Sequence, residues 1–430
     1  MKIHFIGIGG IGVSALAQYY LEKGHQISGS DLVASEITEF LKNKGIDIFI
    51  GNSAAHIQQD CDLVIHSPAV KSDNSEFVGA KSMKIPLQSY PEALGQLTKE
   101  YYTIAVSGSH GKSTTTALIA LVLVKAGLDP TVIVGTKLKE FNDSNFRMGK
   151  SKYLVIEACE YDSSFANYFP KITVVTNVDK EHLDYFKTFK NVIAEFKKFI
   201  LKLPADGFLV ANKDDKHLVK ISKGKFTSIY YSIRQKDAAK VKKILKIPGQ
   251  HNVSNALAAL SVARILNIKD GIIFKSLSLY KGSWRRFEIK EGKVGTKKII
   301  VVSDYGHHPN EILATLISSR EKYPSKKIWC VFQPHQYQRT YYLFDDFVKV
   351  FRKVKINEIL ITDIYDVAGR EEKEINAEVN SEKLAKKINR KNIRYMALAD
   401  AEKMVKEHIK SGQVLIIMGA GNIYKLVDRF

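Results

Sequence analysis

The chain of 430 residues is 45% hydrophobic and 26% charged, and it carries a formal net charge of +20 at pH 7. This composition excludes a fibrous or wholly disordered protein and suits two or three globular domains. Its three cysteines offer neither a disulfide framework nor a metal-binding spacing, and no apolar run reaches the roughly 18 residues of a membrane span. We therefore expect a cytoplasmic protein that does not insert into membranes.

The positive charge leaves the type of partner open. Lysine-rich stretches at residues 240–246 and 383–391 alternate with apolar residues at helical spacing, which is typical of solvated helix faces. A nucleic acid would be attracted by such a field, but so would a small polyanionic substrate. The charge alone does not decide between them.

A glycine-rich loop follows the first predicted strand. Residues 2–6 are predicted to be a short strand, residues 7–12 have the spacing G-x-G-x-x-G, and residues 13–21 are predicted to be a helix. The next strand leads to Asp31, near the spacing at which an acidic residue binds a ribose hydroxyl. The pattern fits NAD, a flavin or another nucleotide diphosphate; alternatively, the glycines serve tight packing alone. The candidate binding residues are Gly9, Gly10, Ile11, Gly12 and Asp31.

The second glycine-rich loop is the more specific motif. Residues 107–114 read Ser-Gly-Ser-His-Gly-Lys-Ser-Thr and lie between a predicted buried strand at 102–106 and an apolar helix at 117–125. Backbone N–H groups at a helix N-terminus bind phosphate, Lys112 can contact the outer phosphates, and the Ser113 hydroxyl can bind Mg2+. Because Val106 stands where the usual Walker loop has glycine, this is a shortened form; the alternative is a plain turn with an exposed lysine. The predicted triphosphate-binding residues are Gly108, Ser109, His110, Gly111, Lys112, Ser113 and Thr114.

Two later strand ends could complete a cation site beside this loop. Glu157 follows the strand 153–156, which we predict to be the next strand after the loop helix, and His182 lies in the polar run after the strand 172–175. Mg2+ takes oxygen ligands, so Glu157 is the best carboxylate partner for Ser113. His182 is a candidate ligand for a second cation. The alternatives are a solvated or salt-bridged Glu157 and a structural His182.

The last part of the chain repeats this arrangement. Strands at 299–302, 328–332 and 414–418 each end in a polar or glycine-rich cluster. Ligands of open α/β sheets bind at the carboxyl ends of strands, so we expect one large site to collect such clusters. The adjacent His307 and His308 do not predict zinc, since no further ligands follow at a usual spacing.

These elements predict an α/β protein of three domains. Residues 1–98 are predicted to be an N-terminal Rossmann-like domain, and residues 99–282 a central domain with the parallel sheet of a P-loop ATPase. Residues 283–430 are predicted to be a C-terminal Rossmann-like domain.

The order of these motifs along nearly the whole chain resembles that of the Mur ligases. Within that family the chain is most similar to the branch that adds L-alanine, the first amino acid of the peptidoglycan stem, to UDP-N-acetylmuramate. The resemblance rests on residues 4–12, 108–116, 157–162, 176–184, 249–255, 285–288, 304–309, 332–340 and 418–423.

The resemblance implies that each of the three domains binds a different substrate. The first domain would hold the UDP part of UDP-N-acetylmuramate, the second would bind ATP and Mg2+, and the third would bring L-alanine. Members of the family phosphorylate the substrate carboxylate to an acyl phosphate, which the amino-acid amine then attacks. The implied catalytic residues are Lys112, Glu157, His182, His307 and Arg339, and the implied metal ligands are Ser113, Glu157 and His182.

Further roles are implied position by position. Asn252 and Asn255 resemble the pair near the adenine, and Arg285 or Arg286 would approach the ATP phosphates. Without the family these residues would be read as a helix cap, a turn and solvated arginines. Ser67 and the first glycine loop would face the UDP. The muramoyl and amino-acid end would be lined by Tyr305, His307, His308, His335 and Arg339. We expect a monomer or a weak homodimer that does not act on nucleic acid.

Some positions depart from the family pattern. The chain has Glu181-His182 where the family usually has Asp-His, which concerns the second metal site. Gln336 stands where some relatives have a basic residue, and Asn422 replaces a common aspartate. Residues 157–162 read Glu-Ala-Cys-Glu-Tyr-Asp instead of Glu-Ala-Asp-Glu-Ser-Asp.

Two other functions are weighed against alanine addition. The recycling branch of the family attaches a whole tripeptide to the same UDP-N-acetylmuramate and shares the Glu-Tyr-Asp of residues 160–162, but it lacks the Gln-Pro-His-x-Tyr-x-Arg-Thr of residues 333–340. A basic nucleotide-binding protein acting on nucleic acid would explain the charge, but it would leave the first glycine loop without a role. Alanine addition is therefore favoured.

Overall fold

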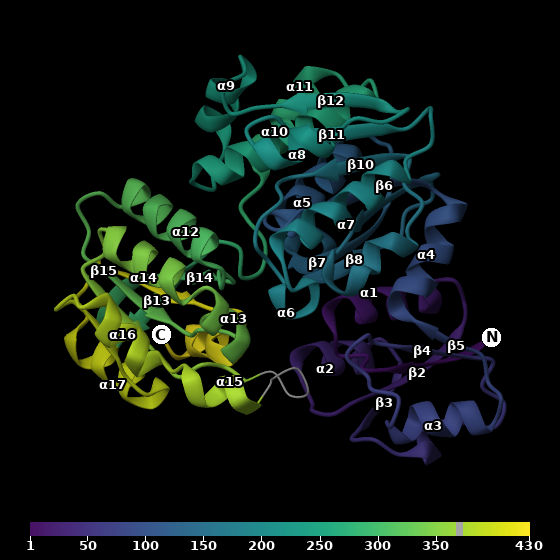
Figure 1. Ribbon diagram of the computed structural model, residues 1–430, viewed down its shortest axis with the longest axis horizontal. Coiled ribbons are helices and arrows are strands. Elements are labelled where there is room, and N and C mark those ends of the chain that lie inside the picture. Colours follow the sequence, from purple (N-terminus) through teal and green to yellow (C-terminus); the bar gives the residue numbers. More distant parts are fainter. Residues whose placement is uncertain (367–372) are drawn as a thin grey trace. The chain divides into compact units, whose positions relative to one another are not determined.

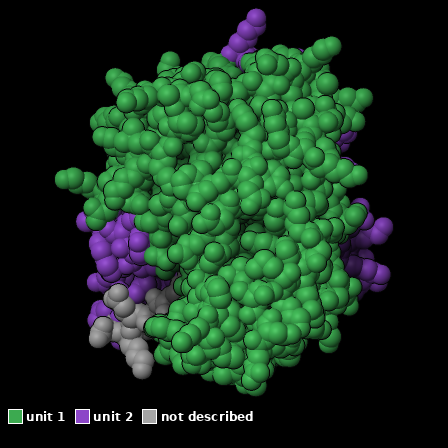
Figure 2. Space-filling view, turned by 90° about the vertical axis from the view of Figure 1, so that its right-hand side faces the viewer, with its two compact units in different colours: residues 1–179, 190–235, 255–277 green, residues 180–189, 236–254, 278–430 purple. Residues whose placement is uncertain are grey.

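The computed structural model describes residues 1–366 and 373–430, and the strands in these ranges form three sheets (Figure 1). One sheet lies in each of the predicted ranges 1–98, 99–282 and 283–430, so the three-part α/β fold is confirmed. Residue contacts group the described chain into two compact units (Figure 2). Unit 1 comprises residues 1–179, 190–235 and 255–277, and unit 2 comprises residues 180–189, 236–254 and 278–430. The domain boundaries after residues 98 and 282 stay predictions.

Unit 1 begins with a parallel sheet and its helices. The elements are β1 (Lys2–Ile6), α1 (Ile11–Glu22), β2 (Gln26–Asp31), α2 (Glu36–Asn43), β3 (Asp47–Ile50), β4 (Leu63–His66), α3 (Ser75–Ser82), β5 (Leu87–Ser89) and α4 (Tyr90–Glu100). The strand order is β3-β2-β1-β4-β5, and β1 lies in the middle because its residues 3–6 are all buried. α4 begins where the Ser89 hydroxyl accepts the N–H of Glu92 and Pro91 occupies the first turn. The glycine loop leaves the carboxyl end of the central strand, as a Rossmann-like domain requires.

The central sheet carries the phosphate loop at the end of a fully buried strand. The elements are β6 (Tyr102–Ser107), α5 (Lys112–Lys125), β7 (Thr131–Leu138), β8 (Ser144–Arg147), β9 (Tyr153–Glu157), β10 (Ile172–Val175), α7 (Phe189–Leu201), β11 (Phe208–Asn212), α8 (Lys216–Ile221), β12 (Thr227–Tyr231), α10 (Gln250–Ile265) and α11 (Asp270–Leu279). The strand order is β12-β11-β10-β6-β9-β7-β8, with β8 antiparallel to β7. The loop therefore lies between the ends of β9 and β10.

The hairpin β7–β8 corrects one sequence prediction. We predicted β9 to be the next strand after the loop helix, whereas β7 and β8 lie between them in the chain. The four residues of β8, Ser-Asn-Phe-Arg, are too short and polar to show the alternation by which a strand is recognised. In the sheet, however, β9 pairs directly with β6. Glu157, at the end of β9, therefore lies on the strand next to the one that leads into the phosphate loop.

The third sheet lies in unit 2 together with two short helices from earlier in the chain, α6 (Leu183–Phe186) and α9 (Asp237–Ile244). Its elements are β13 (Glu288–Val294), β14 (Lys297–Asp304), α12 (Pro309–Lys322), β15 (Ile328–Phe332), α13 (Tyr337–Tyr342), α14 (Phe344–Lys353), β16 (Glu358–Ile361), α15 (Lys373–Glu378), α16 (Ser381–Ile388), β17 (Ile393–Tyr395), α17 (Leu398–His408) and β18 (Val414–Met418). The strand order is β13-β14-β18-β15-β16-β17, with β13 antiparallel to β14. One apolar cluster, which includes Phe332 and Phe347, joins a face of this sheet to α12, α14 and α16. A second cluster, which includes Trp329 and Val405, joins the other face to α17.

Among the residues that the structure describes, no helix combines the length and apolar character that a membrane crossing requires.

His4 is a buried histidine in the middle of the first sheet. It lies on β1 with 1% of its surface exposed, and its Nδ1 lies 2.8 Å from Ser28 Oγ on β2. Burial, with a contribution from His56, lowers the pKa of His4 to about 4. The folded protein therefore keeps this imidazole neutral at pH values where an unfolded histidine is protonated.

We predict that the free energy of unfolding falls between pH 7 and pH 5, and that His4→Gln weakens this fall by about 2 kcal/mol. Between pH 6.5 and about 4 the unfolded chain takes up a proton that folded His4 does not accept, so stability is lost as the pH falls through this window. Urea denaturation at the two pH values measures the difference, with His408→Gln, at an exposed position, as the control. An unchanged pH dependence in His4→Gln would contradict this assignment.

Candidate active site

Asp31 and Ser67 contact the backbone of the first glycine loop. The N–H of Gly9 donates to Asp31 Oδ2 at 2.9 Å, so the predicted ribose-binding acid holds the loop itself. Ser67 follows β4, and a Cβ at Gly7 would lie 3.0 Å from the Ser67 Cβ. The predicted residues Gly9, Gly10, Ile11, Gly12, Asp31 and Ser67 all lie at the carboxyl edge of the first sheet.

The phosphate loop has no room for side chains at two of its glycines. Gly108 and Gly111 have φ values of +132° and +80°, which other residues rarely adopt. A Cβ at Gly108 would lie 2.0 Å from Thr176 Oγ1, and one at Gly111 would lie 2.5 Å from Asn255 Oδ1. Gly111 directly precedes α5, whose first N–H groups have no partner inside the helix. The loop and the helix N-terminus together can bind phosphate.

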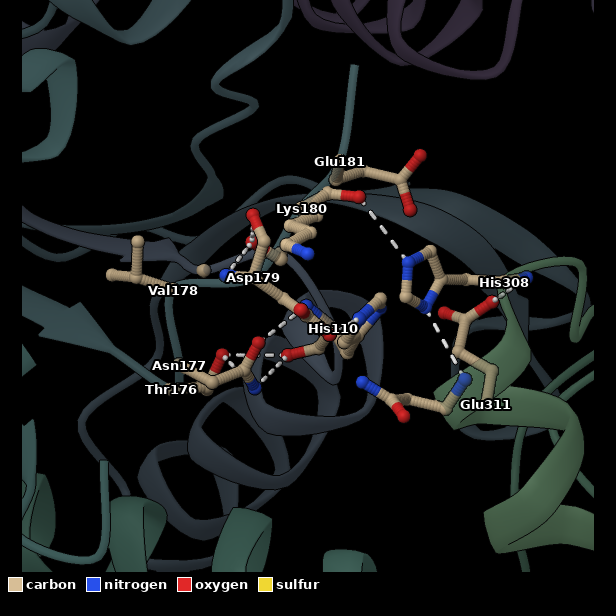
Figure 3. A network of polar contacts seen from close by, with 12 residues as sticks. His110, Thr176, Asn177, Val178, Asp179, Lys180, Glu181, His308 and Glu311 are labelled. Carbon is tan, nitrogen blue, oxygen red and sulfur yellow. Dashed lines mark hydrogen bonds and ion pairs between the residues drawn. The ribbon is translucent and has the colours of Figure 1, made fainter. Parts of the chain in front are cut away.

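The segment after β10 holds the phosphate loop in place (Figure 3). Asn177 Oδ1 accepts the N–H of His110 at 2.9 Å, and Asn177 Nδ2 donates to the His110 carbonyl at 3.0 Å. The His110 Nε2 lies 2.9 Å from Asp179 Oδ2, and the N–H of Asp179 donates to Ser109 Oγ at 2.9 Å. No separate role was predicted for Asn177 or Asp179, although both lie in the polar run after a predicted strand.

Lys112 is paired with a buried carboxylate. Its Nζ donates to Glu160 Oε2 at 2.9 Å and to the carbonyl of Gly108 at 2.7 Å. Glu160 has no exposed surface, so its charge requires a cation beside it. Burial by itself would lower the pKa of Lys112, but the charge of Glu160 raises it above its ordinary value. Glu160 therefore sets the position of the charged lysine; its only sequence signal is that it is the second acid of the run after β9.

Ser113 and Glu157 lie side by side. Ser113 Oγ donates to Glu157 Oε1 at 3.2 Å, and Glu157 Oε2 accepts the N–H of Gly135 on β7 at 2.9 Å. A Cβ at Gly135 would lie 2.6 Å from this carboxylate oxygen, so glycine leaves the room that Glu157 occupies. A hydroxyl and a carboxylate are oxygen donors of the kind that Mg2+ prefers. His182 belongs to unit 2, where it precedes α6, and its role as a metal ligand stays a prediction.

The two asparagines predicted to lie near the adenine are both on the first turns of α10. Asn255 belongs to unit 1 and approaches Gly111 of the phosphate loop. Asn252 belongs to unit 2, and its Nδ2 donates to the carbonyl of Pro248 at 2.6 Å. The structure therefore ties Asn255 to the phosphate loop, and a contact between Asn252 and the adenine stays a prediction.

Arg339 and Glu181 form a buried ion pair in unit 2. The Nε and Nη2 of Arg339 donate to Glu181 Oε1 at 3.1 and 2.9 Å, and 8% and 4% of the two side chains are exposed. Burial alone would raise the pKa of Glu181, but the charges of Arg339 and of nearby histidines hold it well below its ordinary value. Arg339 Nη1 lies 3.1 Å from both the carbonyl oxygen and Nδ1 of His335, whose ring stacks on Tyr365. The predicted residues His335 and Arg339 thus lie together.

His307 and His308 make different contacts at the start of α12. The ring of His308 caps the helix, and its Nε2 lies 3.3 Å from the carbonyl of Lys180 (Figure 3). His307 Nδ1 lies 3.1 Å from the carbonyl of Tyr305, and its ring centroid lies 5.9 Å from that of His335. Burial lowers the pKa of His307 to about 4, so it is neutral at pH 7. Because a carbonyl can only accept, Nδ1 carries the proton and Nε2 the lone pair.

Arg285 is buried. Without the family resemblance, the sequence had predicted a solvated arginine at this position. Its side chain donates to the carbonyls of Gly419 and Gly421 at 2.5 and 3.1 Å, and 5% of the residue is exposed. Both bonds are made by Nη2 of the guanidinium. Arg286 is only partly buried, and a contact of either arginine with the ATP phosphates stays a prediction. The rings nearest to the Arg285 guanidinium are those of Trp284, Tyr305 and Tyr424.

Of the departures at Gln336 and Asn422, only the second has a side-chain hydrogen bond among the residues that the structure describes. Asn422 Oδ1 accepts a hydrogen bond from Gln333 Nε2 at 3.1 Å. Gln336 is buried, and its carbonyl accepts the hydroxyl of Thr340 at 2.9 Å. The Asn422 side chain therefore supports the segment that carries His335 and Arg339, whereas Gln336 contributes a backbone carbonyl that any residue would supply.

Family models match the chain in three consecutive parts. Residues 2–102 match the Mur ligase family catalytic domain, residues 106–263 the Mur ligase middle domain, and residues 285–421 the Mur ligase glutamate ligase domain. Together these matches cover most of the chain.

Relatives and solved structures agree with these matches. The chain is 41% identical to the UDP-N-acetylmuramate–L-alanine ligase of Alkaliphilus metalliredigens, with 99% of this chain and 96% of that protein covered. The UDP-N-acetylmuramate-alanine ligase structure from Thermotoga maritima has a TM-score of 0.83 and 28% identity, covering 100% and 98% of the two chains. A murein peptide ligase structure from Psychrobacter arcticus has a TM-score of 0.75 and 23% identity over 100% and 98%, which is a likeness of fold.

We predict that Arg339→Met lowers the free energy of unfolding by about 3–5 kcal/mol, because it leaves Glu181 charged and buried without its partner. The double variant Arg339→Met/Glu181→Leu removes both charges, and it should recover most of the loss. Urea denaturation at pH 7 measures both effects. An equal loss in the double variant would mean that packing, and not the unpaired charge, is responsible.

Proposed function

This chain belongs to the Mur ligase family, and from that premise we propose that it uses ATP to join L-alanine to the carboxylate of UDP-N-acetylmuramate, a step of peptidoglycan precursor synthesis. The observation that carries the proposal is the similarity to a ligase of this name across 99% of the chain. A match of that extent includes the parts assigned to the UDP substrate, to ATP and to the amino acid. The site geometry supports the same reaction.

The residues of the phosphate loop fit ATP and Mg2+. Gly108 and Gly111 leave the backbone open to phosphate, and Lys112 is charged and held beside the loop by Glu160. Ser113 and Glu157 would hold Mg2+, with His182 as the proposed ligand of a second ion. Bound there, Mg2+ would neutralise negative charge on the phosphates.

The proposed reaction has two steps. A carboxylate oxygen of UDP-N-acetylmuramate attacks the terminal phosphorus of ATP, the bond to ADP breaks, and an acyl phosphate forms. The amine of L-alanine then attacks the acyl carbon, the amine loses a proton and inorganic phosphate leaves. Lys112 stabilises negative charge on the transferred group, and catalysis otherwise depends on holding the carboxylate and ATP in line.

The polar cluster of unit 2 is the proposed binding site for the muramoyl and amino-acid end. Arg339 supplies a positive charge, and its guanidinium group is held in place by Glu181. His335 lies beside Arg339, and His307 lies beside His335. The neutral His307 offers a nitrogen lone pair to a donor such as an amine.

A second candidate is addition of the stem tripeptide to the same UDP-N-acetylmuramate. The Glu-Tyr-Asp run at 160–162 favours it. The segment 333–340 favours alanine, because it supplies His335 and Arg339 to the buried cluster.

We predict that the purified protein releases phosphate from MgATP only when both UDP-N-acetylmuramate and L-alanine are present. Lys112→Ala should lower the rate by at least about 100-fold, because the transferred charge loses its partner. A coupled phosphate assay compares L-alanine, the tripeptide and no amino acid. Release with the tripeptide alone would assign the recycling reaction. If nucleic acid stimulates phosphate release and neither amino substrate does, the ligase proposal is wrong.

We predict that Gly135→Ala lowers kcat by about 100-fold, because the added methyl group displaces the Glu157 carboxylate from its place beside Ser113. The dependence of the rate on Mg2+ concentration should shift to higher concentrations. Gly271→Ala is the matched control, since a Cβ there meets open space. Equal rates in the two variants would show that the position of Glu157 does not matter.

A further inference from the structure

A buried polar cluster joins the first glycine loop to the central sheet within unit 1. Helix α1, whose first two residues are the last two of the glycine loop, lies beside β7 and β8 (Figure 1). The facing residues on α1 are Ser14 and Gln18, and those on β8 are Ser144 and Asn145. All four are at most 5% exposed. Such a cluster is unusual at a helix–sheet contact, where apolar side chains would pack without directional bonds.

Asn145 is the centre of this cluster. Its Nδ2 donates to the carbonyl of Ile11 and, at 2.9 Å, to Ser14 Oγ, while its Oδ1 accepts from Gln18 Nε2 at 2.9 Å. Gln18 Oε1 in turn accepts the Ser144 hydroxyl at 3.0 Å. Because each bond has a direction, the cluster admits one position of the first turns of α1 along β8. An apolar contact of the same area would tolerate sliding.

The same hairpin also contacts the proposed metal ligand. The N–H of Gly135 on β7 holds Glu157 Oε2, while Asn145 on β8 holds the carbonyl of Ile11. The hairpin β7–β8 therefore contacts helix α1 at the glycine loop and the Glu157 carboxylate beside the phosphate loop. The hairpin is thus one of the links between the loop assigned to UDP and the loop assigned to ATP.

We propose that Asn145 is a positioning residue that sets the glycine loop relative to the phosphate loop, so that the carboxylate of UDP-N-acetylmuramate meets the terminal phosphate of ATP. This inference rests on the proposed function. Asn145 holds the glycine loop through the backbone carbonyl of Ile11, which leaves the N–H groups of the loop to the substrate. We therefore expect each substrate still to bind alone when Asn145 is replaced, whereas phosphoryl transfer needs both at once. A misplacement of about 1 Å between reacting groups can cost about 100-fold in rate.

The test separates binding from turnover. For Asn145→Ala we expect the Kd of a non-hydrolysable ATP analogue and the Kd of UDP-N-acetylmuramate, each measured alone by calorimetry, to stay within about 2-fold, while kcat falls by about 10- to 100-fold. Glu36→Gln is the matched control, because its carboxylate makes an exposed ion pair with Lys137 of β7. The control should change kcat by less than about 2-fold.

A second variant guards against loss of folding. Gln18→Met/Asn145→Leu replaces the polar groups by apolar side chains of similar size, so thermal stability should return toward that of the wild type while kcat stays low. If kcat recovers together with stability, or if one Kd rises in step with the loss of kcat, the positioning role is wrong. If the wild type releases no phosphate with both substrates, the proposed function fails and this role falls with it. An active wild type with an equally active Asn145→Ala overturns the positioning role alone.

Discussion

Two glycines of the phosphate loop touch other parts of unit 1 so closely that no side chain would fit, and the surroundings of the loop follow from that contact. The segment after β10 approaches Gly108, and α10 approaches Gly111. With both sides covered, the side chain of Lys112 is only 14% exposed and lies beside the fully buried Glu160. A charge in such a place would be costly without a partner. Glu160 supplies that partner. The packing that makes a binding site for phosphate thus also creates the need for an internal counter-charge.

Unit 2 also contains a cation that is paired with a buried carboxylate. Arg339 is more deeply buried than Lys112, and Glu181 neutralises it as Glu160 neutralises the lysine. Both cations are proposed to meet anionic groups of the substrates, and both are held in place by a carboxylate of the protein. The large positive charge of the chain lies elsewhere, on exposed lysines such as those of α9 and α16. Surface charge and site charge are therefore separate features of this protein.

The sequence predicted the parts of the fold that follow from local pattern. The two glycine loops, the strands before them and the pairing of Ser113 with Glu157 were expected, because loop, strand end and helix start are each recognisable in a few residues. Glu160, Asn177 and Asn145 were not assigned, because their roles depend on partners that are distant in the chain. The hairpin β7–β8 was missed for a related reason: its second strand is polar where it meets α1. Arg285 could not be placed, since its partners at Gly419 and Gly421 lie more than a hundred positions further on.

Both tryptophans of the chain lie in unit 2, so the two units differ in their intrinsic fluorescence. Trp284 lies beside the buried guanidinium of Arg285, and Trp329 lies in an apolar cluster of the third sheet, so both belong to unit 2. Unit 1, with both glycine loops, contains tyrosines but no tryptophan. Intrinsic tryptophan fluorescence therefore reports on unit 2 alone. Circular dichroism reports on both halves, and a difference between the two signals during denaturation would reveal whether the units unfold together.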